Sequence, residues 1–126
     1  IAPMMVSRSL VELANKGNSF AADFIIKYGM SKTLIGIKNT FPSNTNQTMF
    51  NDLSACKSYM PNEAFFSEIG MPVNIILGGK DRLIDSDQAK VFAGNLSSEI
   101  HVIDDAGHFP FFENPAELSS IIETVI

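Results

Sequence analysis

The chain has 126 residues, enough for one domain with its own core but few for a complete α/β enzyme. Its net charge of −5, with nine scattered Lys and Arg residues, argues against binding nucleic acid or an anionic membrane surface. The single cysteine, Cys56, excludes an internal disulfide, and no stretch approaches the roughly 18 apolar residues of a membrane span, so we expect a cytoplasmic protein.

The pattern of residues 1–69 is helical. Helices are predicted over about residues 7–15, 18–28, 46–59 and 63–69, with a long Ser-, Thr- and Asn-rich loop over 31–46. Ser7 is placed to cap the first helix, and Gly17 and Gly29 follow the ends of the first two. The apolar residues at helical spacing, which we interpret as core, are Leu10, Val11, Ala14, Phe20, Phe24, Ile25, Met49, Phe50, Leu53 and Cys56.

Residues 70–126 alternate between strand and helix. Residues 73–81 are predicted to form a buried strand that runs into a Gly-rich turn ending at Asp81, and residues 99–104 a second strand. Asp85 is placed to cap the helix between them, and Asn114 to cap a final helix whose first residue is Pro115. Two strands joined by a crossover helix form a right-handed β-α-β unit, which predicts a parallel pair.

A residue suited to acid–base chemistry follows each strand. Asp81 comes after the first strand, and His108 comes after the second. Because the carboxyl ends of parallel strands meet at one edge of a sheet, we expect the two side chains to lie together there. An Asp in this place can orient an imidazole that takes a proton from a nucleophile. The plainer interpretation is an Asp that caps its own turn and a histidine bonded to backbone.

Two segments resemble the C-terminal part of proteins with the α/β-hydrolase fold. Residues 71–84, Met-Pro-Val-Asn-Ile-Ile-Leu-Gly-Gly-Lys-Asp-Arg-Leu-Ile, resemble the family's penultimate strand and catalytic-acid turn. Residues 103–115, Ile-Asp-Asp-Ala-Gly-His-Phe-Pro-Phe-Phe-Glu-Asn-Pro, resemble its histidine loop. The resemblance is close over residues 71–126 and weaker over 1–70. It implies an α/β fold in which residues 70–126 are the C-terminal β-α-β-α segment and residues 1–69 a helical cap.

The resemblance also implies a chemistry. His108 would be the general base and then the general acid, and Asp81 would orient it, in the hydrolysis of an ester or related acyl bond of a small molecule. No metal or organic cofactor is needed. The nucleophile, usually Ser in a G-x-S-x-G elbow, precedes both residues in this family, so we expect it in a missing N-terminal half upstream of this chain. Leu83 and Phe109 share loops with the pair and are candidate substrate-binding residues.

Other candidates have plainer explanations. Gly17-Asn18-Ser19-Phe20-Ala21 approximates the elbow, but an amphipathic helix precedes Ser19 where the elbow needs a strand. His101 is expected to pack within its strand, and it has no recognised metal-ligand spacing with Asp104, Asp105 or His108. Glu113 is expected to brace the histidine loop through backbone N–H groups. Phe20, Phe24, Met30, Met49 and Phe50 are candidates for an acyl pocket, although Met and Phe at helical spacing are usually packing residues.

Two alternatives remain open at this point. A non-catalytic module that binds a ligand or partner would keep the same fold without the chemistry. A self-contained flavodoxin-type domain would need at least four strands, whereas two are clear in the sequence. If the chain has the α/β-hydrolase fold, with or without the chemistry, the strand at 72–77 has at most residues 1–5 as a partner on its second edge. An unpaired edge invites another chain, which predicts a homodimer through that strand.

Overall fold

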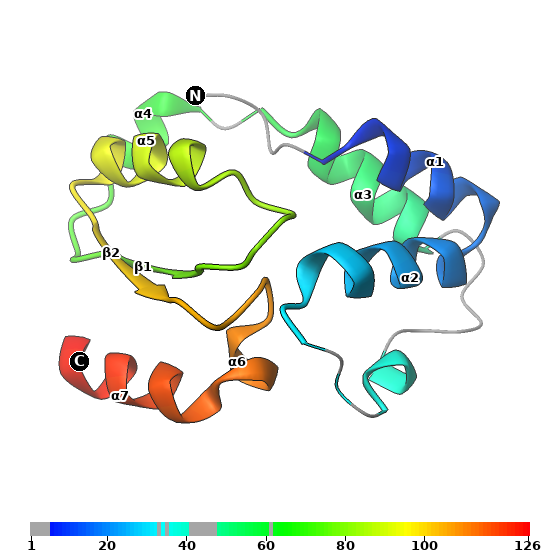
Figure 1. Cartoon of the computed structure of the whole chain (residues 1–126). Coiled ribbons are helices and arrows are strands. Elements are labelled where there is room, and N and C mark those ends of the chain that lie inside the picture. Colours follow the sequence, from blue (N-terminus) through cyan, green and yellow to red (C-terminus); the bar gives the residue numbers. More distant parts are fainter. Residues whose placement is uncertain (1–5, 33, 35, 41–47, 61) are drawn as a thin grey trace. The chain divides into compact units, whose positions relative to one another are not determined.

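The computed structural model describes residues 6–32, 34, 36–40, 48–60 and 62–126 (Figure 1). The chain divides into two compact units. Unit 1 consists of Ile1–Lys27 and Thr33–Pro61, and unit 2 of Tyr28–Lys32 and Asn62–Ile126. The assignment of residues 1–69 to a cap stays a prediction.

Unit 1 is helical, as the sequence predicts. Its elements are α1 (Arg8–Lys16), α2 (Asn18–Gly29, as far as Lys27), the 3-10 helix η1 (Ile37–Thr40) and α3 (Thr48–Ser58). The side-chain oxygen of Ser7 accepts the N–H of Leu10 at 3.1 Å, which confirms the predicted cap of α1. Gly17 ends α1 with φ of 147°, a conformation that side chains rarely adopt. The η1 helix lies within the predicted loop, and residues 46–47 of the third predicted helix lie outside the described residues.

The core of unit 1 forms where the helical stripes predict it. Leu10, Ala14 and Ala21 are buried. The partly buried residues that pack against them are Val6, Phe24, Ile25, Met49, Phe50 and Leu53, so Phe24, Met49 and Phe50 are packing residues. The placement of Phe20 in this stripe is wrong, because its side chain is 53% exposed. A helix has a polar and an apolar side, but periodicity alone does not fix how wide the buried side is.

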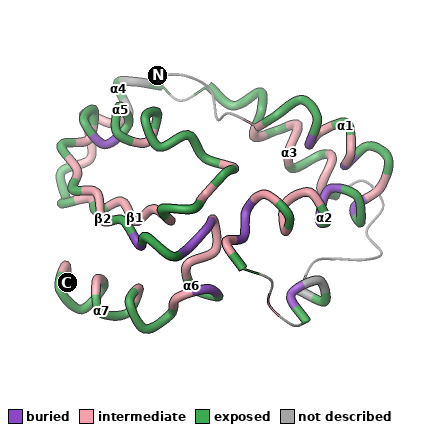
Figure 2. Tube along the Cα trace, in the orientation of Figure 1, coloured by how far each residue is buried: buried purple, intermediate pink, exposed green. Residues whose placement is uncertain are grey.

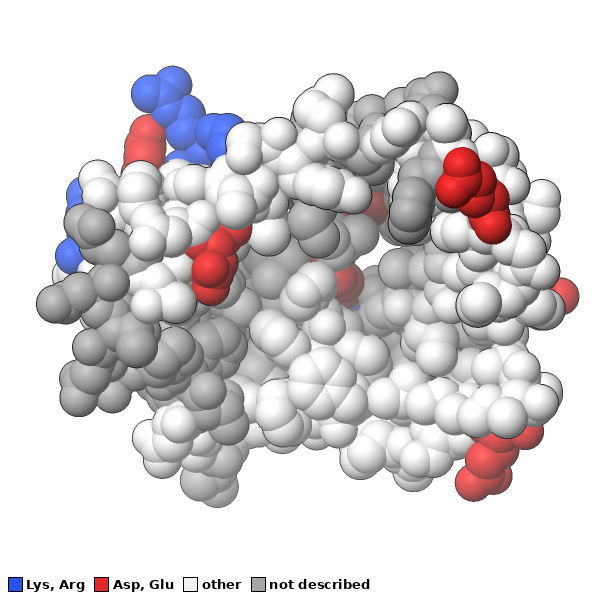
Figure 3. Space-filling model, turned by 180° about the vertical axis from the view of Figure 1, so that it is seen from behind, with Lys and Arg blue, Asp and Glu red and all other residues white. Residues whose placement is uncertain are grey.

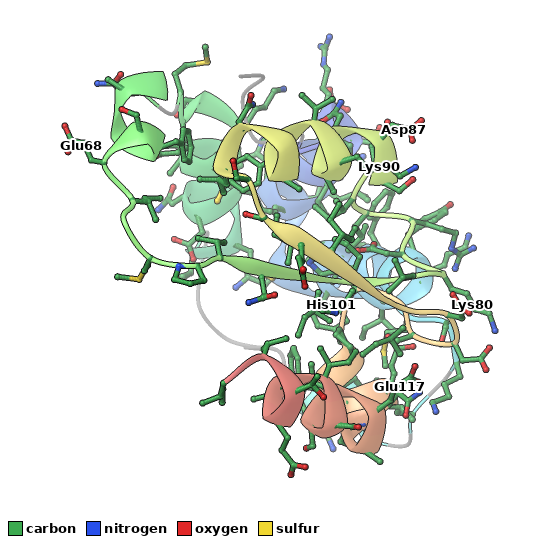
Figure 4. All side chains as sticks on the ribbon, turned by 90° about the vertical axis from the view of Figure 1, so that its left-hand side faces the viewer. Glu68, Lys80, Asp87, Lys90, His101 and Glu117 are labelled. Carbon is green, nitrogen blue, oxygen red and sulfur yellow. The ribbon has the colours of Figure 1, made fainter. Side chains whose placement is uncertain are left out.

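Unit 2 has the predicted α/β arrangement. It contains α4 (Glu63–Ser67), β1 (Asn74–Gly78), α5 (Ser86–Leu96), β2 (Glu99–Ile103), α6 (Pro110–Glu113) and α7 (Pro115–Val125). The two strands are parallel, with Asn74 opposite Glu99 and Gly78 opposite Ile103, and they form the whole sheet within the described residues. Helix α5 covers one face of this pair and α7 the other, as Figures 1 and 4 show.

Local signals set most of the boundaries in unit 2. Asp85 caps α5 as predicted, since its carboxylate accepts the N–H groups of Asp87 at 2.9 Å and Gln88 at 3.4 Å. Helix α5 ends at Leu96, two residues beyond Gly94. Asn114 precedes α7 but does not cap it through its side chain, which donates to the Glu117 carboxylate at 2.6 Å instead.

Burial in unit 2 is concentrated at one end of the sheet rather than under the helices. Apart from Ala93 in α5, its buried residues lie at the ends of β2 and α2 and in the segments that follow them, where Figure 2 shows purple stretches: Gly29, Met30, Ile103, Ala106, Gly107 and Glu113. Helix α7 has no buried residue, and the strand residues of β1 are at most half-buried. The loops beyond the strands are therefore the best-packed part of this unit.

The surface is sparsely charged on the face drawn in Figure 3, where most of the visible Lys and Arg side chains lie at one edge. Among the helices of the described residues, none combines the length and apolar character that crossing a membrane requires.

Candidate active site

The predicted acid lies in the turn that follows β1. One carboxylate oxygen of Asp81, Oδ1, accepts the N–H groups of Leu83 at 2.8 Å and Ile84 at 3.2 Å. The other, Oδ2, is 2.9 Å from Nδ1 of His108. The Asp81 side chain is only 8% exposed, so these bonds replace most of its contact with water. The structure thus brings the two predicted residues together and at the same time lets Asp81 cap its own turn.

The environment of Asp81 favours its charged form. Burial would raise the pKa of this carboxyl group, but the hydrogen bond from His108 lowers it. The backbone N–H groups of Leu83 and Ile84 and the charge of His108 add to this, and the net pKa lies below the ordinary value of 3.8. An ionised Asp81 accepts a proton-bearing Nδ1, which leaves Nε2 of the neutral imidazole as the basic nitrogen.

His108 presents this second nitrogen without a competing bond. Nε2 has no hydrogen-bond partner among the residues that the structure describes. The side chain is 35% exposed, so a reacting group can approach it. The ring of Phe109 meets the imidazole edge to face, with centroids 5.1 Å apart and planes at 88°. The imidazole is held at one nitrogen and one face and is open at the other nitrogen.

The two loops approach so closely that glycines are required. Gly79 N–H donates to the carbonyl of Ile103 at 2.9 Å, and Lys80 N–H donates to that of Ala106 at 2.8 Å. A Cβ atom at Gly78 would collide with the carbonyl oxygens of Gly107 and Ala106. One at Gly79 would lie 2.9 Å from the backbone of Asp104. The acid turn and the histidine loop are therefore in direct backbone contact.

A third segment, Tyr28–Lys32, also contributes to the site, and the sequence analysis missed it. The backbone N–H of His108 donates to the carbonyl oxygen of Gly29. A Cβ at Gly29 would lie 2.8 Å from Leu83 Cδ1 and 3.1 Å from Phe109 Cε2, so the two predicted substrate-binding residues meet there. The sequence signal for such an approach is the glycine at position 29, which a helix end explains equally well.

Glu113 braces the histidine loop, as the sequence predicts. Glu113 is buried, with only 3% of its surface exposed. Oε1 accepts the N–H groups of Gly107 at 2.9 Å and Phe109 at 3.4 Å, and Oε2 accepts that of Ser31 at 2.7 Å. A buried carboxylate needs such donors, because an unpaired one would be costly.

An open hollow of about 390 Å³ lies beside the acid. Met30, Ser31, Gly79, Lys80, Asp81 and Arg82 line it. Arg82 lies over the ring of Tyr28, 5.6 Å from its centroid. Lys80, labelled in Figure 4, pairs with Asp105 at 2.6 Å. The hydrogen bond and the charge of Lys80, with a smaller effect of the Lys32 charge, lower the pKa of Asp105. Of the residues suggested for an acyl pocket, Met30 is the one that lines this hollow.

The remaining candidates lie elsewhere. Ser19 is an exposed residue within α2, which supports the helical explanation over the elbow. His101 packs across the strand pair, with Nε2 3.0 Å from Oδ1 of Asn74. Within the described residues, no group of three or more His, Cys, Asp and Glu side chains has the arrangement of a metal site.

Comparison with known proteins identifies the fold. No protein-family model and no curated protein sequence matches the chain. Among solved structures, a thermophilic esterase aligns with a TM-score of 0.81 and 22% identity, over 98% of this chain and 52% of the esterase. An esterase from Exiguobacterium antarcticum aligns with a TM-score of 0.77 and 15% identity, over 93% of this chain and 46% of that one.

A third match is a membrane phospholipase A, described as a bacterial virulence factor, with a TM-score of 0.60 and 16% identity over 98% of this chain and 44% of its own. The chain thus spans about half the length of the solved structures it matches. Over that length the chain has an esterase-like α/β fold, which confirms the predicted fold class.

Proposed function

We propose that this chain supplies the acid and the base of an ester hydrolase of the serine type. The observation that carries the proposal is the 2.9 Å contact between Asp81 Oδ2 and His108 Nδ1, with Nε2 left open. The esterase-like fold supports it, because two of the matched structures are esterases and a third is a phospholipase A.

In the proposed reaction, Nε2 of His108 takes the proton of a serine hydroxyl as its oxygen attacks the ester carbonyl. Asp81 holds the imidazole in the tautomer that can accept this proton and stabilises the imidazolium that forms. The imidazolium then gives the proton to the leaving alkoxide, and an acyl-enzyme remains. His108 then takes a proton from a water molecule that attacks the acyl carbonyl, and the imidazolium returns this proton to the serine oxygen as the carboxylic acid leaves. The lowered pKa of Asp81 fits this role, since a protonated acid could not stabilise the imidazolium.

The nucleophile and the oxyanion hole are proposed to lie in the other half of the fold, outside these 126 residues. Ser19 is not a substitute, because a residue within a helix lacks the strained strand-to-helix turn of an elbow. The proposal therefore expects that this chain alone does not turn over esters.

The proposed substrate is a small acyl ester, and Leu83 and Phe109 are proposed to contact it. Both adjoin the reacting pair in sequence, and both are half-buried apolar residues beside His108. Residues 1–69 are proposed to be part of a cap over the acyl site. The site is proposed to work in the cytoplasm, where the free thiol of Cys56 would stay reduced.

The test compares the two histidines of the chain in a longer polypeptide that contains both halves of the fold. With p-nitrophenyl acetate as substrate, His108→Ala should lower kcat by about 10⁴-fold or more. His101→Ala is the matched control and should change kcat by less than about twofold, since the side-chain partners of His101 are Asn74 on the neighbouring strand and Glu99 in its own strand. Turnover that survives His108→Ala would refute the proposal. His108-dependent turnover by the 126-residue chain alone would refute the placement of the nucleophile.

A non-catalytic binding module is distinguished by the same longer polypeptide. Ser or Cys in its elbow supports the enzyme, whereas Gly or Ala there supports a binder that keeps the pair for structural reasons.

A further inference from the structure

The segment Tyr28–Lys32 is joined to the histidine loop by four hydrogen-bond contacts, three of Ser31 and one of Gly29. Ser31 N–H donates to Glu113 Oε2, and the Ser31 hydroxyl lies within bonding distance of Glu113 Oε2 and of the Asp105 carbonyl oxygen, at 2.8 Å from the latter. The carbonyl of Gly29 accepts the N–H of His108. Asp105 lies 74 and Glu113 82 residues after Ser31 in the sequence, so these bonds link distant parts of unit 2.

Glu113 connects Ser31 to the histidine. Its Oε2 faces Ser31, and its Oε1 faces the N–H groups of Gly107 and Phe109, the residues on either side of His108. The carboxylate is rigid and planar, so the direction of one oxygen fixes the direction of the other. Whatever holds Oε2 therefore holds the backbone from which the imidazole projects.

The hydroxyl has one proton for its two acceptors. It donates at any moment to Glu113 or to the Asp105 carbonyl, while the Ser31 amide donates to Glu113 throughout. The hydroxyl consequently ties Ser31 to both ends of the loop, before and after His108.

We propose that Ser31 is a positioning residue for His108. It acts through Glu113 and Asp105, and it fixes the backbone of residues 105–109 so that Nδ1 stays on Asp81. The benefit of this positioning for catalysis rests on the proposed hydrolase function. The positioning itself does not, because the hydrogen bonds exist without substrate.

Hydrogen exchange in the 126-residue chain tests the proposal without any need for turnover. In Ser31→Ala, we expect the Nδ1 proton of His108 and the N–H of Gly107 to exchange about tenfold faster, as loss of a hydrogen bond to a charged group predicts. Amides of the β1–β2 ladder should keep their rates. Ser31→Thr keeps the hydroxyl and should restore exchange to within about twofold of the native chain.

A matched control and a second variant complete the test. Ser67→Ala removes a hydroxyl that also donates to a carbonyl, that of Ala64 at 2.7 Å, but far from Glu113 in sequence, and it should leave His108 unchanged. Glu113→Gln should speed hydrogen exchange at His108 more than Ser31→Ala does, because the amide NH₂ of Gln would face N–H donors on one side. Exchange at His108 in Ser31→Ala within twofold of native would overturn the proposal. So would an equal rise throughout the strand ladder, which would mark Ser31 as a general structural residue.

The outcome is separable from that of the proposed function. In the longer polypeptide, Ser31→Ala should lower kcat about tenfold with KM unchanged. If the native polypeptide hydrolyses no ester but the exchange result holds, the hydrolase proposal fails and Ser31 still positions His108. If it does hydrolyse esters and Ser31→Ala changes neither exchange nor kcat, this inference fails alone.

Discussion

Gly78→Ala is the sharpest test of how closely the acid turn and the histidine loop approach. Gly78 ends β1, and its φ is not positive, so its backbone accepts Ala. An Ala in a strand is favoured over Gly by about 0.5–1 kcal/mol through backbone entropy. The new methyl group would, however, collide with the carbonyl oxygens of Gly107 and Ala106 and lie 2.7 Å from the carbonyl carbon of Gly107. These are backbone atoms, which cannot move aside as a side-chain end would.

The magnitude follows from these two opposing effects. Overpacking of this kind costs about 3 kcal/mol at the upper end of its usual range, so a net loss of about 2 kcal/mol is expected. With a urea m-value of about 1.5 kcal/mol/M, the unfolding midpoint should fall by about 1.3 M. Urea unfolding followed by circular dichroism measures this directly.

Gly94→Ala is the matched control. Gly94 lies in α5, and a Cβ added there would meet nothing within 4 Å. The free energy of unfolding should rise by about 0.5–1 kcal/mol, because Ala is the better helix residue. Gly29→Ala should fall between the two, since the nearest atom is the flexible end of Leu83 at 2.8 Å. If Gly78→Ala unfolds at the native urea concentration while Gly94→Ala is stabilised, the direct backbone contact of the two loops is wrong.

Three further predictions concern the acid, a helix cap and the strand edge. The folded pKa of Asp81 is lowered, so its carboxylate stabilises the fold above the ordinary value of 3.8 and this contribution is lost as the pH falls through the folded pKa. The difference in urea midpoint between the native chain and Asp81→Asn should accordingly shrink below about pH 4; a difference that grows on acidification in that range contradicts this sign. Asp85→Ala removes two side-chain bonds to the start of α5 and should cost about 1 kcal/mol, measured by the same urea unfolding, whereas no loss would mean that the cap is dispensable. The second edge of β1 has no strand partner among the described residues, and we propose that a second copy of the chain pairs there. Static light scattering at high protein concentration should give the mass of a dimer, and a monomeric mass argues against it.

Features with a local cause could be predicted from the sequence. The caps at Ser7 and Asp85 depend on residues three positions away or fewer, and each strand is a short segment of mostly apolar residues. The proximity of Asp81 and His108 is not local, but it follows from a rule of topology, because residues just after adjacent parallel strands share an edge.

Features that depend on distant packing could not be predicted. The contact between Gly29 and the histidine loop joins residues 79 positions apart with no pattern to mark it (from 29 to 108). The exposure of Phe20 depends on what covers that side of α2, and α6 has only four residues, too few for a periodic signal. At Asn114 two local bonds compete, to the helix N–H groups or to Glu117, and the sequence does not decide which forms.

Asp81 and His108 are placed by backbone contacts rather than by a conventional side-chain core. The N–H groups of Gly79 and Lys80 bond to the loop after β2, and that of His108 bonds to Gly29, while β1 is at most half-buried and α7 buries nothing. Carbonyl-to-amide contacts at glycines leave little freedom, since any residue with a Cβ at Gly78 or Gly107 would push the loops apart. The relative position of Asp81 and His108 is therefore specified by three short segments of this chain. The other half of an esterase-like sheet would be needed to bring a nucleophile to Nε2, not to align the imidazole with its carboxylate.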